Sequence, residues 1–151
     1  MFMEFVEDQI FLFIALAVIV AMLIYSYVGD KLAGFQTIGA DEAVRVFNRD
    51  AWVLDVRTEN EYKTGFIGEA ENISSTEVTK QMEKILTHKD QEVLVYCQSG
   101  ARSAAVAGRL AKQGFSKVYN LRGGIMSWKL AGLPLNMPQS KKQKKKAQQG
   151  A

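Results

Sequence analysis

The chain has 151 residues, a formal net charge of +3 and 48% hydrophobic residues. This length and composition suit one globular domain with an adequate core. The chain holds one cysteine, Cys97, and one histidine, His88. These counts exclude an intramolecular disulfide and a zinc site built from a Cys and His cluster. We therefore expect stability to come from packing, with no metal and no cofactor.

The first predicted element is an uncharged, apolar segment at residues 10–28. At about 1.5 Å per residue it would span about 28 Å, close to the hydrocarbon thickness of a bilayer. Residues 1–9 before it carry Glu4, Glu7 and Asp8 and no Lys or Arg, whereas a secretory signal begins with positive charge. We predict a transmembrane helix rather than a cleaved signal peptide or the buried helix of a soluble domain.

The orientation of this helix follows from the positions of the cations. All 19 Lys and Arg residues come after the apolar segment, and the positive-inside rule places that side in the cytoplasm. A reducing compartment would also keep the Cys97 thiol free. The prediction is a single-pass protein of the inner (cytoplasmic) membrane, with its C-terminal domain in the cytoplasm.

The rest of the chain is expected to form a linker at 29–36, one compact domain at 37–137 and a disordered basic tail at 138–151. The tail has five lysines and, beyond its proline, no apolar residue larger than alanine, so it cannot bury enough surface to order itself. Without these lysines the net charge would be −2. A merely solvated tail, attraction to anionic lipid or to RNA, and a specific protein partner all stay open.

Helical and strand patterns alternate along the domain. Helices are expected at 41–48, 77–86, 103–113 and 125–130, and strands at 51–56, 70–73, 92–96 and 117–121. Apolar strands separated by helices predict an α/β fold in which a mostly parallel sheet is covered by helices on both faces. Ligands bind such sheets beyond the carboxyl ends of the strands. Both Cys97 and Asp55 lie at such ends.

Cys97 stands between the expected strand at 92–96 and the expected helix at 103–113. A thiol at such a turn is close to unpaired backbone N–H groups and to the positive end of the helix dipole, which favour the thiolate. The sequence therefore predicts a nucleophile. The alternative is a buried free thiol that serves only as a small apolar residue.

Three motifs occur in order along the domain. They are Leu54-Asp55-Val56-Arg57 with Glu61-Tyr62 and residues 65–73; Val95-Tyr96-Cys97 with Gly100, Arg102 and Ser103; and residues 121–128, LRGGIMSW. Together they resemble the motifs of the rhodanese family. The resemblance implies a rhodanese-like fold, here preceded by a transmembrane helix. It also implies that the chain is a sulfurtransferase in which Cys97 receives a sulfane sulfur from a donor such as thiosulfate and passes it, as a persulfide, to a thiol or cyanide.

The implied substrate-binding residues are those that follow the cysteine, namely Gln98, Ser99, Gly100, Ala101, Arg102 and Ser103. Their backbone N–H groups would stabilise the persulfide anion, and Arg102 would hold an oxyanion such as sulfite. Asp55 and Arg57 are supporting residues. They would either form a salt bridge with Glu61 that shapes the pocket wall or contact the substrate directly.

Three positions depart from the family pattern. Gln98 replaces a frequent Arg and removes one cation from the loop. Glu69 stands where the pattern has Gly, with Gly68 one place earlier, so the turn there is expected to differ. Phe66 replaces the usual His, a change that bears mainly on packing. The remaining imidazole, His88, is expected to be solvent-exposed and without a role.

Two other functions stay open. One is a non-catalytic, membrane-tethered protein-interaction module. The other is a phosphatase or arsenate reductase, whose loops place the Arg six positions after the Cys, whereas Arg102 is five after Cys97. The physiological donor and acceptor, the protein partner and the oligomeric state do not follow from the sequence.

Overall fold

The computed structural model describes residues 2–139 and residue 150, without the side chains of residues 2–8 and 30. The chain divides into two compact units between Ala33 and Gly34. The expected basic tail at 138–151 falls almost entirely outside the described residues.

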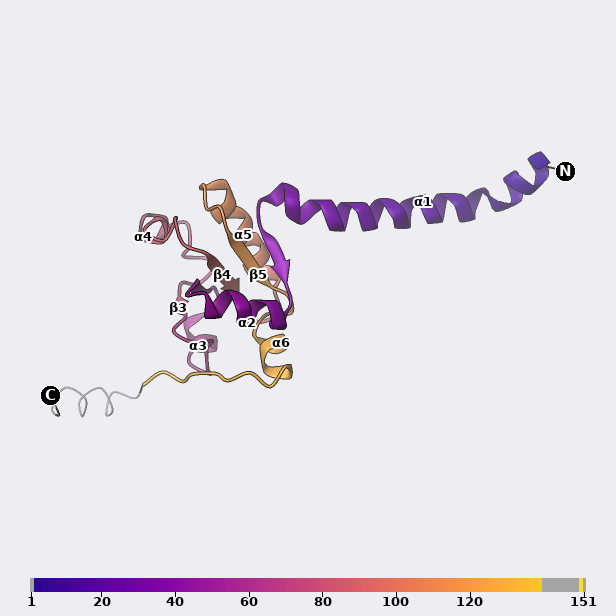
Figure 1. Ribbon diagram of the computed structural model, residues 1–151. Helices are drawn as coiled ribbons and strands as arrows, with labels where there is room; N and C mark the ends of the chain where they lie inside the picture. The colour runs from indigo at the N-terminus through magenta and orange to yellow at the C-terminus, as the bar shows by residue number, and fades with distance from the viewer. Residues whose placement is uncertain (1, 140–149, 151) are drawn as a thin grey trace. The chain divides into compact units, whose positions relative to one another are not determined.

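The first unit is a single helix, α1 (Phe2–Ala33) (Figure 1). From Gln9 to Ala33 it is long and apolar enough to cross a membrane, a test that a signal sequence or the buried helix of a soluble protein also passes. It contains the helix predicted at 10–28 and continues through most of the expected linker.

The second unit is built on one sheet of five strands, all parallel, in the order β1-β5-β4-β2-β3. The strands are β1 (Gln36–Ile38), β2 (Trp52–Asp55), β3 (Glu71–Asn72), β4 (Val93–Tyr96) and β5 (Val118–Leu121). This confirms the predicted parallel sheet. The central strand β4 is buried along its whole length, as expected for a strand with helices on both of its faces.

In the described part of this unit, five helices accompany the sheet, as Figure 1 shows in outline. They are α2 (Ala40–Asn48), α3 (Glu59–Tyr62), α4 (Met82–Leu86), α5 (Ala101–Lys112) and α6 (Gly124–Leu130). Residues of α2 and α6 share one core cluster with Val53, Leu94 and Tyr96. Side chains alternate between the faces of a strand, so Leu54 and Val95, equally buried, point to the other face. There α5 contacts β4 and β5.

Three elements differ from the prediction. Strand β1 lies at the end of the expected linker and the start of the expected domain. Its three residues pass from exposed to buried at an edge of the sheet, so they show no apolar run. Helix α3 has four residues and no buried side chain, hence no apolar periodicity. Helix α4 covers only the second half of the helix predicted at 77–86.

His88 is less exposed than expected, because its side chain is only partly exposed. It stacks on Trp52 with ring centroids 4.0 Å apart and an interplanar angle of 3°. Nδ1 also lies 3.1 Å from the Gln91 side-chain oxygen. Ordinary packing accounts for this histidine.

The register of the sheet positions the site. Asp55 pairs with Tyr96 as β2 lies parallel to β4, so both strands end at one edge. Cys97 follows Tyr96 directly, and Arg57 follows Asp55 by two residues. The two sequence motifs therefore meet at the carboxyl edge of the sheet, where ligands of parallel sheets bind.

Candidate active site

Cys97 lies in the turn between β4 and α5. Gly100, the residue before α5, has φ +100°, a conformation that glycine adopts without a steric penalty. A Cβ on Gly100 would approach the Leu121 carbonyl oxygen and the Gly123 nitrogen to 3.2 Å. Glycine thus lets the turn curl tightly at the start of the helix.

Two hydrogen-bond donors lie close to the Cys97 sulfur. The Gly100 N–H donates to Sγ over 3.0 Å, and the Ser103 hydroxyl oxygen lies 3.4 Å from it. Burial raises the pKa of the Cys97 thiol, but hydrogen bonds from the Ser103 side chain and from the N–H groups of Ser103, Gly100 and Ser99 outweigh it, so the pKa is lowered. The arrangement favours the thiolate, although Cys97 has no exposed surface.

The Ser103 hydroxyl is shared between several acceptors. It lies 2.6 Å from Asn120 Oδ1 and 3.1 Å from the Gly100 carbonyl oxygen, as well as 3.4 Å from Sγ. A hydroxyl has one hydrogen to donate. We expect it to point to Asn120 beside the neutral thiol and to turn to the sulfur when Cys97 ionises.

Replacing Ser103 with Ala should therefore raise the pKa of Cys97 and slow its alkylation at neutral pH severalfold. The measurement is the rate of iodoacetamide modification against pH. In the native protein its midpoint should lie below about 8.5, the value of a free cysteine. The matched control is Ser99→Ala, which keeps the backbone N–H and should leave the midpoint unchanged. An unchanged midpoint in Ser103→Ala would contradict the assigned hydrogen bond.

The backbone at the start of α6 donates hydrogen bonds to the Cys97 turn. The Ile125 N–H donates to the Cys97 carbonyl over 2.9 Å, and the Met126 N–H reaches the Gln98 carbonyl at 3.4 Å. Gly124 has φ +60°, and a Cβ there would collide with the same two carbonyl oxygens. The glycine pair of the third motif is therefore needed for the close approach of α6 to the turn.

Replacing Gly124 with Ala should displace the turn and lower the free energy of unfolding by more than the ~1–2 kcal/mol of left-handed strain alone. It should also alter the pH midpoint of Cys97 alkylation, because the N–H groups around the sulfur would move. Gly132, with φ +72° and open space around it, supplies the control. Gly132→Ala should show the strain without the change in reactivity. Equal behaviour of the two variants would refute the contact.

Asp55 and Arg57 form a buried ion pair. Arg57 Nε donates to both carboxylate oxygens over 3.0 Å, and its terminal nitrogen donates over 2.6 Å to Asp55 and 2.7 Å to the Gly65 carbonyl. The two side chains are 0% and 1% exposed. Burial lowers the pKa of Arg57, and the hydrogen bonds and charge of Asp55 raise it by more. The two supporting residues therefore bind each other at the end of β2.

Glu61 is not part of that pair, contrary to the expectation. Its carboxylate accepts two hydrogen bonds from Arg102, over 2.8 and 2.9 Å. It also accepts from the backbone and hydroxyl of Thr58, over 2.9 Å each. This is a capping box at the start of α3, and its T-x-x-E signature is readable at residues 58–61.

Of the predicted loop residues, Gly100 and Ser103 contact the Cys97 sulfur, and Arg102 binds Glu61 instead. Gly100 and Ser103 are buried, Gln98 and Arg102 are partly exposed, and Ser99 and Ala101 are exposed. Asn120, on β5, is buried beside Ser103 and also reaches the Gly100 carbonyl over 3.4 Å. It was not predicted, and only its polarity within an apolar strand could have indicated it.

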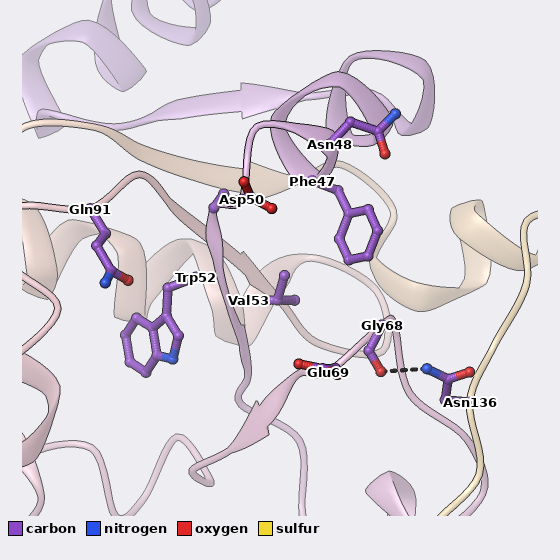
Figure 2. Close-up of a pocket in the computed structure, with 10 residues that line it drawn as sticks. Phe47, Asn48, Asp50, Trp52, Val53, Gly68, Glu69, Gln91 and Asn136 are labelled. Atoms are coloured by element: carbon purple, nitrogen blue, oxygen red, sulfur yellow. Dashed lines mark hydrogen bonds between the residues drawn. The ribbon is translucent and has the colours of Figure 1, made fainter.

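A separate hollow of about 680 Å³ lies near the amino end of β2 (Figure 2). In Figure 2 Trp52, Asp50 and Phe47 lie along it, and the Asn136 side chain donates to the Gly68 carbonyl over 2.7 Å. Gly68 has φ +54°, and a Cβ there would strike the Phe47 ring. Gly68 therefore makes the left-handed turn that precedes Glu69. No residue of the Cys97 turn lines this hollow.

Comparison with known proteins agrees with this geometry. Residues 39–131 match the model of the rhodanese-like domain. A sulfurtransferase of Allochromatium vinosum is 39% identical over 90 residues, covering 60% of this chain and 82% of the relative. The thiosulfate sulfurtransferase GlpE of Coxiella burnetii is 39% identical over 84 residues, covering 56% and 77%.

Solved structures share the fold. The crystal structure of a rhodanese-related protein from Thermoplasma volcanium superposes with a TM-score of 0.62 and 33% identity, covering 68% of this chain and 99% of that one. The match to the family model, over residues 39–131, includes the strands and the turn that hold Cys97, Asp55 and Arg57 here. This chain belongs to the rhodanese-like domain family.

Proposed function

We propose that this chain is a sulfurtransferase that carries a sulfane sulfur on Cys97. The observation that supports it most directly is the environment of Sγ, with the Gly100 N–H at 3.0 Å and the Ser103 hydroxyl at 3.4 Å, at the start of a helix. These donors suit a sulfur anion whether it belongs to the thiolate or to the persulfide. The names of the two bacterial relatives point to the same chemistry.

In the proposed reaction the Cys97 thiolate attacks the outer sulfur of a donor such as thiosulfate. A new S–S bond forms on Cys97 while the donor's S–S bond breaks, and the donor leaves with the electron pair, as sulfite when the donor is thiosulfate. A thiolate or cyanide then attacks the outer sulfur and regenerates the Cys97 thiolate. Residues 98–103 bind the substrate, and Asp55 with Arg57 supports the turn.

The test is mass spectrometry of the full-length chain in detergent after treatment with thiosulfate or an alkyl hydropersulfide. One added sulfur should be found on the peptide that contains Cys97, and cyanide should remove it as thiocyanate. The matched control, Cys97→Ser, should gain none. The absence of added sulfur with both donors would reject the proposal and favour the interaction module, which the complete burial of Cys97 also suits.

The membrane location is also proposed. The length and apolar composition of α1 support a single span, and the distribution of Lys and Arg supports a cytoplasmic domain on the inner membrane. Protease protection of the domain in sealed vesicles distinguishes the two orientations.

A further inference from the structure

The proposed reaction suits more than one class of sulfur donor. The charges around the Cys97 turn restrict which of these donors can bind. The only cation between Cys97 and Ser103 is Arg102. Thiosulfate carries two negative charges, so its binding depends on unpaired cations or on many N–H donors. Thiosulfate binding here therefore depends on whether the Arg102 guanidinium is unpaired.

The guanidinium is already engaged. Two of its nitrogens donate to the two oxygens of Glu61, over 2.9 and 2.8 Å, which is the bidentate geometry that arginine forms most strongly with a carboxylate. The two side chains are 38% and 33% exposed. The charge that the family motif offers to an oxyanion is therefore neutralised by a side chain of this same protein.

Glu61 is itself held in place and stays ionised. The capping box with Thr58 fixes its carboxylate. The hydrogen bonds from Arg102, and to a smaller extent those from Thr58, lower the pKa of Glu61 to about 2, although burial acts to raise it. Arg102 has its pKa raised, first by Glu61 and to a smaller extent by the charges of Cys97 and Asp55. The pair therefore persists throughout the neutral pH range.

The other nearby charges do not replace Arg102. Arg57 is buried, and its Nε and one terminal nitrogen donate to Asp55 and to the Gly65 carbonyl. Arg109 shares a hollow of about 490 Å³ with Arg102, but it lies seven residues further along α5, which places it about 10 Å further along the helix. Among the described residues, those near Sγ supply N–H and hydroxyl donors but no unpaired cation.

We infer that Glu61 is a specificity-determining residue that masks Arg102, so that the site takes its sulfur from alkyl hydropersulfides, which carry at most one negative charge, in preference to dianionic thiosulfate. This rests on the proposed function. The thiolate attacks the outer sulfur of R–S–SH, the S–S bond of the donor breaks, and R–S⁻ leaves while Cys97 holds the S–SH group. No oxidant or reductant is needed, and the R–S–SH form that reacts brings no negative charge to the site.

The test is the single-turnover rate at which full-length protein in detergent gains the Cys97 persulfide, measured by rapid quench and mass spectrometry. The donors are thiosulfate and an alkyl hydropersulfide whose alkyl group carries no charge. Glu61→Gln keeps an oxygen for the capping box but frees Arg102. It should raise the second-order rate constant with thiosulfate roughly tenfold or more, because thiosulfate would bind more tightly. The rate constant with the hydropersulfide should stay within about twofold of the native value.

Glu59→Gln is the matched control, because Glu59 lies on the same short helix but pairs with Lys63 rather than with Arg102. It should change neither rate. The thiosulfate rate of Glu61→Gln should also become more sensitive to salt than that of the native protein. The inference fails if the native protein reacts faster with thiosulfate, or if Glu61→Gln slows both donors equally. If neither donor forms a persulfide, the proposed function fails instead.

Discussion

Replacing Cys97 with Ser should reduce sulfur transfer by on the order of 10⁴- to 10⁶-fold, or to the uncatalysed rate if that is reached first. A serine hydroxyl is not ionised by the donors around Sγ, and an oxygen cannot carry the sulfur between donor and acceptor. The measurement is thiocyanate production from cyanide with the preferred donor, using full-length protein in detergent.

The same substitution should leave the fold unchanged. Serine is slightly smaller than cysteine, and its oxygen can accept the hydrogen bond that the Gly100 N–H donates to Sγ. The thermal unfolding midpoint should therefore stay close to that of the native protein. Substantial turnover by a folded Cys97→Ser variant would show that another group carries the sulfur.

Replacing Asp55 with Ala should destabilise the domain by about 3–5 kcal/mol, the usual cost of leaving one partner of a buried ion pair alone. Arg57 would keep a charge in a site where it is 1% exposed. It would lose the hydrogen bonds from its side chain and its backbone N–H to the carboxylate. Since small domains have only about 5–15 kcal/mol of stability, much of the total would be lost. Urea unfolding followed by circular dichroism measures it.

Two further variants separate the unpaired charge from the cavity. Adding Arg57→Met to Asp55→Ala removes the charge, so the double variant should be more stable than Asp55→Ala alone. Glu59→Ala breaks the exposed ion pair with Lys63, whose side chains are 75% and 58% exposed. It should cause no measurable change. A double variant no more stable than Asp55→Ala would attribute the loss to packing.

The prediction of the fold succeeded where a short stretch of sequence carries the signal. Strands β2, β4 and β5 are apolar runs that are buried on both faces, so their existence follows from local composition. The prediction failed where an element depends on its neighbours. The residues of β1 form a strand because β5 lies beside them, and Glu61 faces Arg102 only when α3 lies beside the turn.

The site shows the same division. Glycines 100 and 124 were readable as turn residues, but their reasons are tertiary, since each would place a Cβ against backbone atoms of another segment. The buried Asn120 lies 2.6 Å from Ser103 across 17 residues of sequence. Such a contact leaves no periodic trace in the sequence, so it could not be predicted.

The sequence by itself determined the apolar N-terminal helix, the alternation of strands and helices, and the place of Cys97 between β4 and α5. These depend on composition and on spacing along a few turns or one strand. Only the tertiary structure decided the partner of Glu61, which pairs with Arg102, 41 residues away, and not with Asp55 and Arg57. The physical reason is that charge pairing is set by distances between side chains, and those are fixed once parallel strands bring their carboxyl ends to one edge of the sheet.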